Sequence, residues 1–126
     1  MRHLCLTVPL LASALGLLAC ASAYANGNIE KGKGLYVQHC AACHSVDYNG
    51  AGPAHAGVFG RKVGSVPNFA YSPALKASKL LWTEANLNQW LADPEKLIPG
   101  QKMWMKVEES TERQDLVAYL KSLVKK

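Results

Sequence analysis

Several common features are scarce or missing in this sequence of 126 residues. Nine acidic residues stand against fourteen lysines and arginines, and there are only two phenylalanines and four cysteines. No basic run interleaved with aromatics occurs, which argues against a nucleic-acid-binding surface. Stretches that alternate apolar and polar residues are also missing, which argues against a sheet. The length allows one domain.

The first 25 residues differ in character from the rest. A basic residue at position 2 precedes an uncharged, largely apolar stretch that ends in Ala23-Tyr24-Ala25. This order is typical of a secretory signal peptide, so we expect a signal peptide at 1–25 and a mature domain at 26–126. Two alternatives remain. About 20 apolar residues can also anchor a chain in a membrane, and LLAC at 17–20 resembles a lipobox that would lipidate Cys20.

The expected mature domain contains only two of the four cysteines, Cys40 and Cys43. A disulfide between them would close a very short loop and would constrain the unfolded chain little, so a structural disulfide is disfavoured. Thirteen basic and nine acidic residues give this part a net charge of +4. That modest charge fits an acidic protein partner better than nucleic acid.

Two segments have the apolar spacing of helices. Residues 83–94 begin with a threonine that can cap the helix and end at Pro94. Residues 111–126 begin with Thr111 and Gln114, which fit a capping box. Together with the missing strand pattern, these segments predict an all-α chain.

The segment 28–44 is also expected to be helical, although it contains Gly32 and Gly34. Each glycine lowers helix propensity by about 1 kcal/mol relative to alanine, so a helix that keeps them needs close contact with another element. Residues 45–73 are rich in glycine, proline, serine and asparagine and indicate a long loop. So long a loop in a small domain is expected only where it wraps around something.

The pattern C-x-x-C-H at Cys40, Cys43 and His44 has three chemical interpretations. A zinc site needs four ligands, and no second C-x-x-C follows. A thioredoxin-like redox pair needs a βαβ context, which is missing. The third interpretation is covalent attachment of a c-type haem, in which the two thiols add to the vinyl groups and the histidine binds the iron. The export signal supports this third interpretation.

A haem iron bound by His44 has one further axial position to fill. The candidates in this sequence are His39, His55, Met103 and Met105. Methionines commonly pack in a core, but Met103 follows a loop that contains Pro-Gly, outside any expected helix. This position favours it as a ligand.

At this point the chain resembles the class I cytochromes c, the mitochondrial-type soluble electron carriers. The resemblance spans most of the expected mature domain and is carried by four segments in the family's order: EKGKGLYVQHCAACHSV, GPAHAGVFGRKVG, WTEANLNQWLADPEKLIPGQKM and ERQDLVAYLK. It implies the class I cytochrome c fold, with three to five helices around one covalently bound haem and the first and last helices crossing. It also suggests a bacterial member of the family.

The resemblance assigns the haem contacts to particular residues. It implies that haem c is bound covalently through Cys40 and Cys43, and that the iron is held by His44 and Met103. It further implies that the carbonyl of Pro53 accepts a hydrogen bond from His44 and so fixes the orientation of the ring.

The same resemblance implies roles for three residues farther along the chain. Arg61, Tyr71 and Trp82 match the positions that hold the haem propionates. Gly32 matches the point where the first helix crosses the last, and Gln101 stands where the family has a threonine.

With both axial positions filled, the resemblance implies a carrier of single electrons and not an enzyme. The alternative is a haem peroxidase or a ligand-binding haem protein, if Met103 is not the sixth ligand. Expected partners are respiratory or photosynthetic membrane complexes with acidic docking surfaces, which the protein contacts transiently and as a monomer. Lysines near the haem edge would steer this encounter: Lys33, Lys96, Lys102 and Lys106. The expected location is the periplasm.

Overall fold

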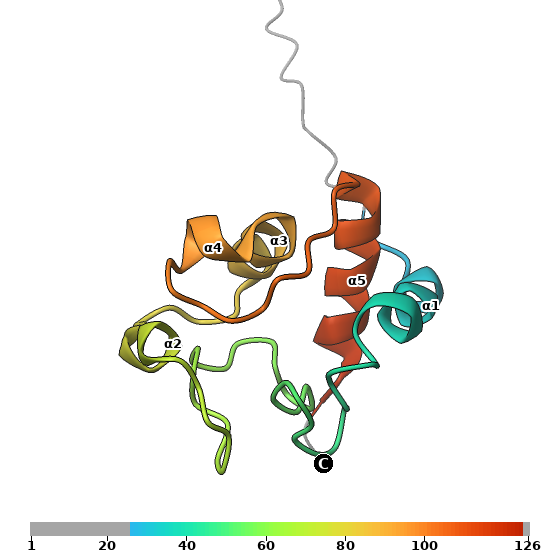
Figure 1. Cartoon of the computed structure of the whole chain (residues 1–126). Coiled ribbons are helices and arrows are strands. Elements are labelled where there is room, and N and C mark those ends of the chain that lie inside the picture. The colour runs from blue at the N-terminus through green and yellow to red at the C-terminus, as the bar shows by residue number, and fades with distance from the viewer. Residues whose placement is uncertain (1–25, 125–126) are drawn as a thin grey trace, which may run out of the picture.

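The computed structural model describes residues 26–124, which form five helices joined by irregular segments (Figure 1). In chain order the helices are α1 (Ile29–His39), α2 (Pro73–Ala77), α3 (Glu84–Ala92), α4 (Pro94–Leu97) and α5 (Ser110–Ser122). Within this part of the chain, the only β-type pairing is an isolated bridge between Lys62 and Leu81. The all-α prediction is therefore confirmed, whereas the predicted signal peptide lies outside the described residues.

The starts of the helices follow from local side-chain hydrogen bonds. The Thr83 hydroxyl accepts a hydrogen bond from the Asn86 N–H at 3.2 Å, so the predicted cap of α3 is present. Helix α3 ends at Ala92, and Pro94 begins α4 instead of ending α3. Proline suits this place because the first N–H groups of a helix have no partner within the helix.

The predicted capping box of α5 is wrong. The helix begins at Ser110, so Thr111 lies inside its first turn, and the cap residue Glu109 makes no side-chain capping bond. The segment before α5 is held by Arg113 instead, whose guanidinium donates to the carbonyls of Val107 at 2.8 Å and Glu108 at 2.6 Å. Arg113 thus ties the preceding segment to α5, although it does not cap the first N–H groups of the helix.

Helices α1 and α5 come from opposite ends of the described chain and lie side by side (Figure 1). At their crossing, a Cβ on Gly32 would overlap the carbonyl of Asp115. The Asn28 N–H also donates to the Asp115 carboxylate at 2.6 Å. Glycine is thus required at position 32 because the two backbones meet there, as the sequence predicted.

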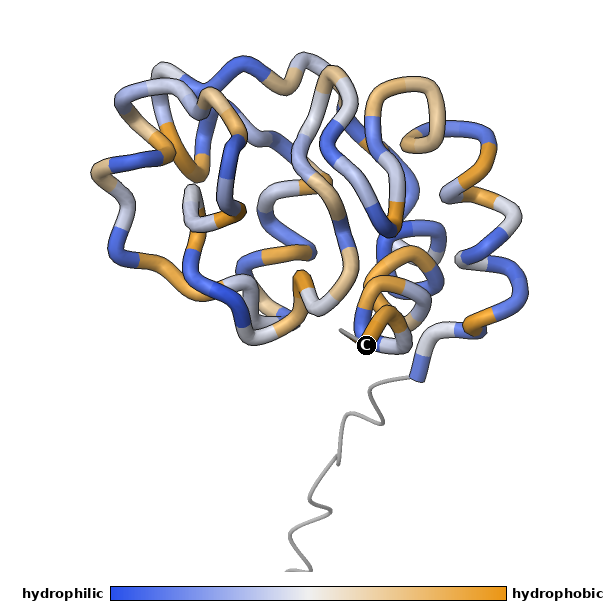
Figure 2. Tube along the Cα trace, turned by 90° about the horizontal axis from the view of Figure 1, so that it is seen from below, coloured by the Kyte–Doolittle hydropathy of each residue, from blue (hydrophilic) through white to orange (hydrophobic). Residues whose placement is uncertain are grey.

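Apolar side chains from the loops and from α1, α2, α3 and α5 form one core, and Leu97 of α4 packs against it. Its centre is on α5, where Leu116 is fully buried. Hydrophobic residues are scattered singly and in short groups among hydrophilic residues along the chain (Figure 2). Between residues 26 and 124, no helix is both long enough and apolar enough to span a membrane.

Candidate functional site

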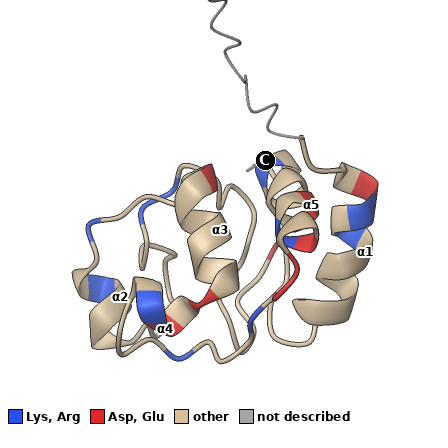
Figure 3. Cartoon of the chain, turned by 90° about the horizontal axis from the view of Figure 1, so that it is seen from above, with Lys and Arg blue, Asp and Glu red and all other residues tan. Residues whose placement is uncertain are grey.

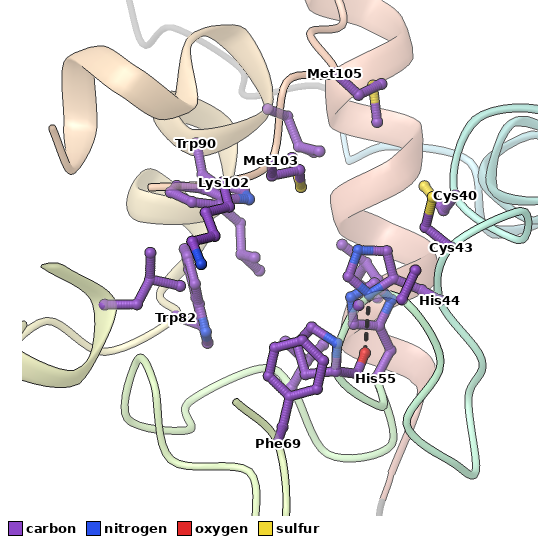
Figure 4. A pocket seen from close by; sticks show the side chains of 18 of the residues that line it. Cys40, Cys43, His44, His55, Phe69, Trp82, Trp90, Lys102, Met103 and Met105 are labelled. Atoms are coloured by element: carbon purple, nitrogen blue, oxygen red, sulfur yellow. Dashed lines mark hydrogen bonds between the residues drawn. The ribbon is translucent and has the colours of Figure 1, made fainter. Parts of the chain in front are cut away.

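A cavity of about 480 Å³ lies between α3, α5 and the long loop that follows α1 (Figure 4). Its size is in the range of sites for small molecules and cofactors, and most of its lining is apolar. All eight residues that the sequence placed at a haem site line this cavity: Cys40, Cys43, His44, Pro53, Arg61, Tyr71, Trp82 and Met103.

The two cysteines and the histidine lie in the turn directly after α1. The Cys40 carbonyl accepts hydrogen bonds from the N–H groups of Cys43 at 3.1 Å and His44 at 2.9 Å, so this turn is internally bonded. Neither cysteine forms a disulfide; Cys40 is buried and Cys43 is exposed. Burial raises the pKa of the Cys40 thiol to about 11, with a smaller contribution from Cys43, so Cys40 is protonated at neutral pH.

The imidazole of His44 is oriented by the loop that follows it. Its Nδ1–H donates to the Pro53 carbonyl oxygen at 2.8 Å, which leaves Nε2 with a free lone pair. The Gly52 backbone lies so close to the ring that any side chain there would overlap it. Burial lowers the pKa of His44, although the bond to Pro53 opposes this effect. The ring is therefore neutral at pH 7, as a metal ligand must be.

Met103 lies across the cavity from His44, in the irregular segment between α4 and α5 (Figure 4). The Met103 N–H donates to the side-chain oxygen of Gln101, a polar residue that is only 4% exposed. The amide nitrogen of Gln101 in turn donates to Glu95 at 3.2 Å. The other Glu95 oxygen accepts from the Gly100 N–H at 2.9 Å. A short hydrogen-bonded network thus fixes the backbone that carries Met103.

This network was missed in the sequence. The sequence marked Gln101 only as a departure from the family pattern, yet Gln101 and Glu95 together hold the methionine segment. The Pro99-Gly100 pair was the sequence signal for this turn. Gly100 adopts a left-handed conformation with φ of 87°, which turns the chain back toward α4.

The other candidate ligands occupy different places in the cavity. His55 stacks on His44 with ring centroids 4.1 Å apart, so it lies on the same side of the cavity as that residue. Burial, His44 and Arg61 together lower the pKa of His55 to about 3, so this ring is also neutral. His39 and Met105 line the cavity as well, and Met105 occupies a different part of the wall from Met103 (Figure 4).

Arg61, Tyr71 and Trp82 lie together on another part of the wall. The guanidinium of Arg61 donates two hydrogen bonds to backbone carbonyls, those of Ala56 at 3.0 Å and Ala54 at 2.9 Å. Its Nε is buried and has no hydrogen-bond partner among residues 26–124. A buried, unpaired donor on a cation suits a carboxylate of a bound group, because leaving it unpaired is costly.

Trp82 is buried and packs edge-on against Trp90, with ring centroids 5.2 Å apart. The Tyr71 hydroxyl accepts a hydrogen bond from the Val66 N–H at 3.3 Å. An apolar cavity with two thiols at one edge and an unpaired guanidinium donor on its wall therefore fits a large, flat, anionic cofactor such as haem. In the described part of the chain, no three His, Cys, Asp or Glu side chains converge as they would around zinc.

Comparison with known proteins agrees with this geometry. The family model described as "Cytochrome c" matches residues 29–124. Cytochrome c of Gibberella zeae is 41% identical over 105 residues, which cover 80% of this chain and 99% of that protein. Cytochrome c2 of Rhodomicrobium vannielii is 41% identical over 104 residues, covering 79% of this chain and 82% of that protein.

A solved structure extends the similarity to the fold. Cytochrome cH from Methylobacterium extorquens is 42% identical, with a TM-score of 0.73, over 76% of this chain and 99% of that chain. The fold predicted from the resemblance is therefore confirmed, and the chain belongs to the cytochrome c family.

Proposed function

We propose that this chain is a monohaem c-type cytochrome that passes single electrons between redox partners. Haem c is attached covalently through Cys40 and Cys43, and it supplies an iron that alternates between two oxidation states. The observation that carries the proposal is that His44 and Met103 face each other across one largely apolar cavity, with the two thiols at its edge.

In this proposal His44, through Nε2, and Met103, through its sulfur, would hold the iron of the haem. The Pro53 carbonyl holds the tautomer of His44 that frees Nε2, and it makes the imidazole a more basic ligand. Gln101 and Glu95 hold the backbone of Met103. His/Met ligation gives the relatively high potential of an electron carrier.

With His44 and Met103 both holding the iron, no position would be open to a substrate, so the protein would transfer electrons without catalysing a reaction. A peroxidase or a gas-binding haem protein needs an open position, and that function would follow only if Met103 did not bind the iron.

Arg61, Tyr71 and Trp82 hold the carboxylate groups of the haem. The support for this assignment is the buried Arg61 Nε, which points to an acceptor beyond the protein's own carbonyls. Burial lowers the pKa of Arg61, with Tyr71 acting in the opposite direction, but a guanidinium is charged at any physiological pH.

Ligation is tested by the oxidised spectrum and by carbon monoxide binding to the reduced protein. The unmodified protein should show the weak near-infrared band of iron–sulfur ligation and should not bind carbon monoxide. Met103→Ala should lose the band and bind carbon monoxide, whereas the matched Met105→Ala should do neither. The opposite pattern in the two variants would assign the ligand to Met105.

The partners are redox proteins of respiratory or photosynthetic membrane complexes with acidic docking surfaces, and the protein meets them as a monomer. Basic residues lie on α2, α4 and neighbouring loops, with acidic residues interspersed (Figure 3). Lys102 lines the haem cavity, whereas Lys106 is paired with Asp93 at 2.8 Å. Docking therefore depends more on Lys102, Lys96 and Lys33 than on Lys106.

The protein acts in the periplasm, after residues 1–25 have been removed as a signal peptide. The basic start and the Ala23-Tyr24-Ala25 ending support export, and attachment of haem to C-x-x-C-H fits the same compartment. The intact mass of the purified protein should correspond to one haem plus a chain that begins at Asn26. A lipid on Cys20, or an uncleaved leader in the membrane fraction, would reject this proposal.

A further inference from the structure

The ring of His55 is packed flat against the ring of His44. The two centroids are 4.1 Å apart and the planes differ by only 18° (Figure 4). The sequence offered His55 as a candidate ligand of the iron, but this stacking puts it beside the proximal histidine. A polar ring is therefore packed against the proposed ligand His44.

His55 is itself held from several directions. Its Nδ1 shares a hydrogen bond of 3.0 Å with the hydroxyl of Tyr36 on α1. Its backbone N–H donates to the Ser45 carbonyl at 2.9 Å, so the residues on both sides of the turn are tied together. The Tyr36 ring is buried and packs edge-on against Tyr119 of α5, with centroids 5.2 Å apart.

These contacts form a continuous chain from the crossing of α1 and α5 to the imidazole of His44. The torsion that rotates an imidazole has a broad energy minimum, so a histidine ring is weakly restrained by its own bonds. The hydrogen bond to Pro53 restrains one edge of the ring. The stacking of His55 restrains the face of the His44 ring, and the hydrogen bond between Tyr36 and His55 keeps the His55 ring from rotating away.

We propose that His55 is a positioning residue which, held by Tyr36, sets the rotation of the His44 ring relative to the haem. This inference rests on the proposed ligation of the iron by His44. It predicts that the hydroxyl of Tyr36, which never touches the haem ligand, influences the electronic state of the iron through His55. Rotation of the His44 ring would weaken its hydrogen bond to the Pro53 carbonyl. The imidazole would then donate less electron density to the iron, which favours the reduced state.

The test uses the holoprotein with three single variants and one double variant. Tyr36→Phe removes only the hydroxyl, and His55→Leu removes the stacking ring and its hydrogen bond. Tyr119→Phe is the matched control, because it removes a hydroxyl from the neighbouring ring of the same cluster. The readouts are the paramagnetically shifted haem-methyl resonances of the oxidised protein, which report the orientation of the axial ligand, and the midpoint potential.

Tyr36→Phe and His55→Leu should each shift the haem-methyl pattern and raise the midpoint potential, with the near-infrared band retained. The double variant, which combines Tyr36→Phe with His55→Leu, should give the same haem-methyl pattern and midpoint potential as His55→Leu alone, because Tyr36 acts only through His55. Tyr119→Phe should leave both readouts unchanged. If Tyr36→Phe changes only the thermal stability and gives the same haem-methyl pattern and potential as Tyr119→Phe, the positioning role is wrong. A missing near-infrared band in the unmodified protein would instead reject the proposed His/Met ligation.

Discussion

Gln101 is hydrogen-bonded to the backbone of Met103 and is almost completely buried, although both residues lie outside the helices. Replacing it with leucine would leave the part-buried Met103 N–H without its acceptor, whereas the exposed Glu95 oxygen could bind water instead. Unpaired buried polar groups cost about 1–3 kcal/mol, and the segment that carries the methionine would loosen.

We therefore expect Gln101→Leu to lower the free energy of unfolding by about that amount and to let the reduced protein bind some carbon monoxide. Urea unfolding and a carbon monoxide titration measure the two effects. Gln89→Leu, the same change at an exposed position of α3, is the control and should show neither. Equal behaviour of the two variants would mean that the methionine segment is held by other contacts.

Covalent attachment of the haem gives a second prediction. Acid-acetone extraction of the denatured protein should leave the haem on the chain, because thioether bonds to Cys40 and Cys43 survive unfolding. Cys43→Ser should also retain its haem through Cys40 alone, whereas the variant lacking both thiols should release it into the solvent. Absorbance of the two phases measures the distribution. Release from the unmodified protein would show that the attachment is not covalent.

The two glycines of α1 should respond in opposite ways to the same substitution. Gly32→Ala places a methyl group against the Asp115 backbone of α5, and we expect about 1–3 kcal/mol of destabilisation from this overlap. Gly34 has no atom within 4 Å of an added Cβ, so Gly34→Ala should stabilise the protein by about 0.5–1 kcal/mol through helix propensity. Denaturant unfolding of both variants measures this. A similar effect at both positions would contradict the close crossing of α1 and α5.

Docking to an acidic partner should depend on ionic strength and on Lys102. Lys102→Glu should slow the second-order rate of electron transfer with a purified membrane complex at low salt, and the rates should converge at high salt. Lys31→Glu makes the same charge change on α1, away from the cavity lining, and should have less effect. The haem spectrum should stay unchanged in both. If the second-order rate of electron transfer changes neither with salt nor with either substitution, docking is apolar and involves the exposed Trp104.

In the sequence, Glu95→Lys looks like a simple way to strengthen a basic docking surface. In the structure, the same substitution also removes hydrogen bonds. Glu95 accepts hydrogen bonds from Gly100 and Gln101, so the substitution would also disturb the methionine segment. Its effect on the transfer rate would therefore combine charge with geometry, and Lys102 is the cleaner position to change.

Local signals in the sequence predicted the three longer helices α1, α3 and α5, but not the short helices α2 and α4, and they predicted helix ends less well. The cap at Thr83 was correct because capping depends on residues within one turn of each other. The capping box at Thr111 was wrong because α5 begins one residue earlier, at Ser110, and Arg113 binds the carbonyls of the preceding segment. A local pattern cannot show which of several nearby residues such a contact will favour.

The same distinction explains which parts of the site could be predicted. The spacing of Cys40, Cys43 and His44 is a local motif with a specific chemistry, so the sequence alone pointed to haem. The contact of His55 with Tyr36 joins residues 19 positions apart and depends on how the loop folds back over α1. No periodicity or spacing encodes that contact, so His55 was interpreted only as a candidate ligand.

The crossing of α1 and α5 also has a meaning in terms of chain entropy. Asn28 and Asp115 are hydrogen-bonded although they are 87 residues apart, so forming this contact closes nearly the whole described chain into one loop. Closing a loop of that length costs about 4–5 kcal/mol in conformational entropy before any contact within it contributes. The interface between the two helices therefore cannot be a local, independent element of stability. The cavity residues lie within the loop that this contact closes, so we expect ordering of the cavity and pairing of α1 with α5 to stabilise each other.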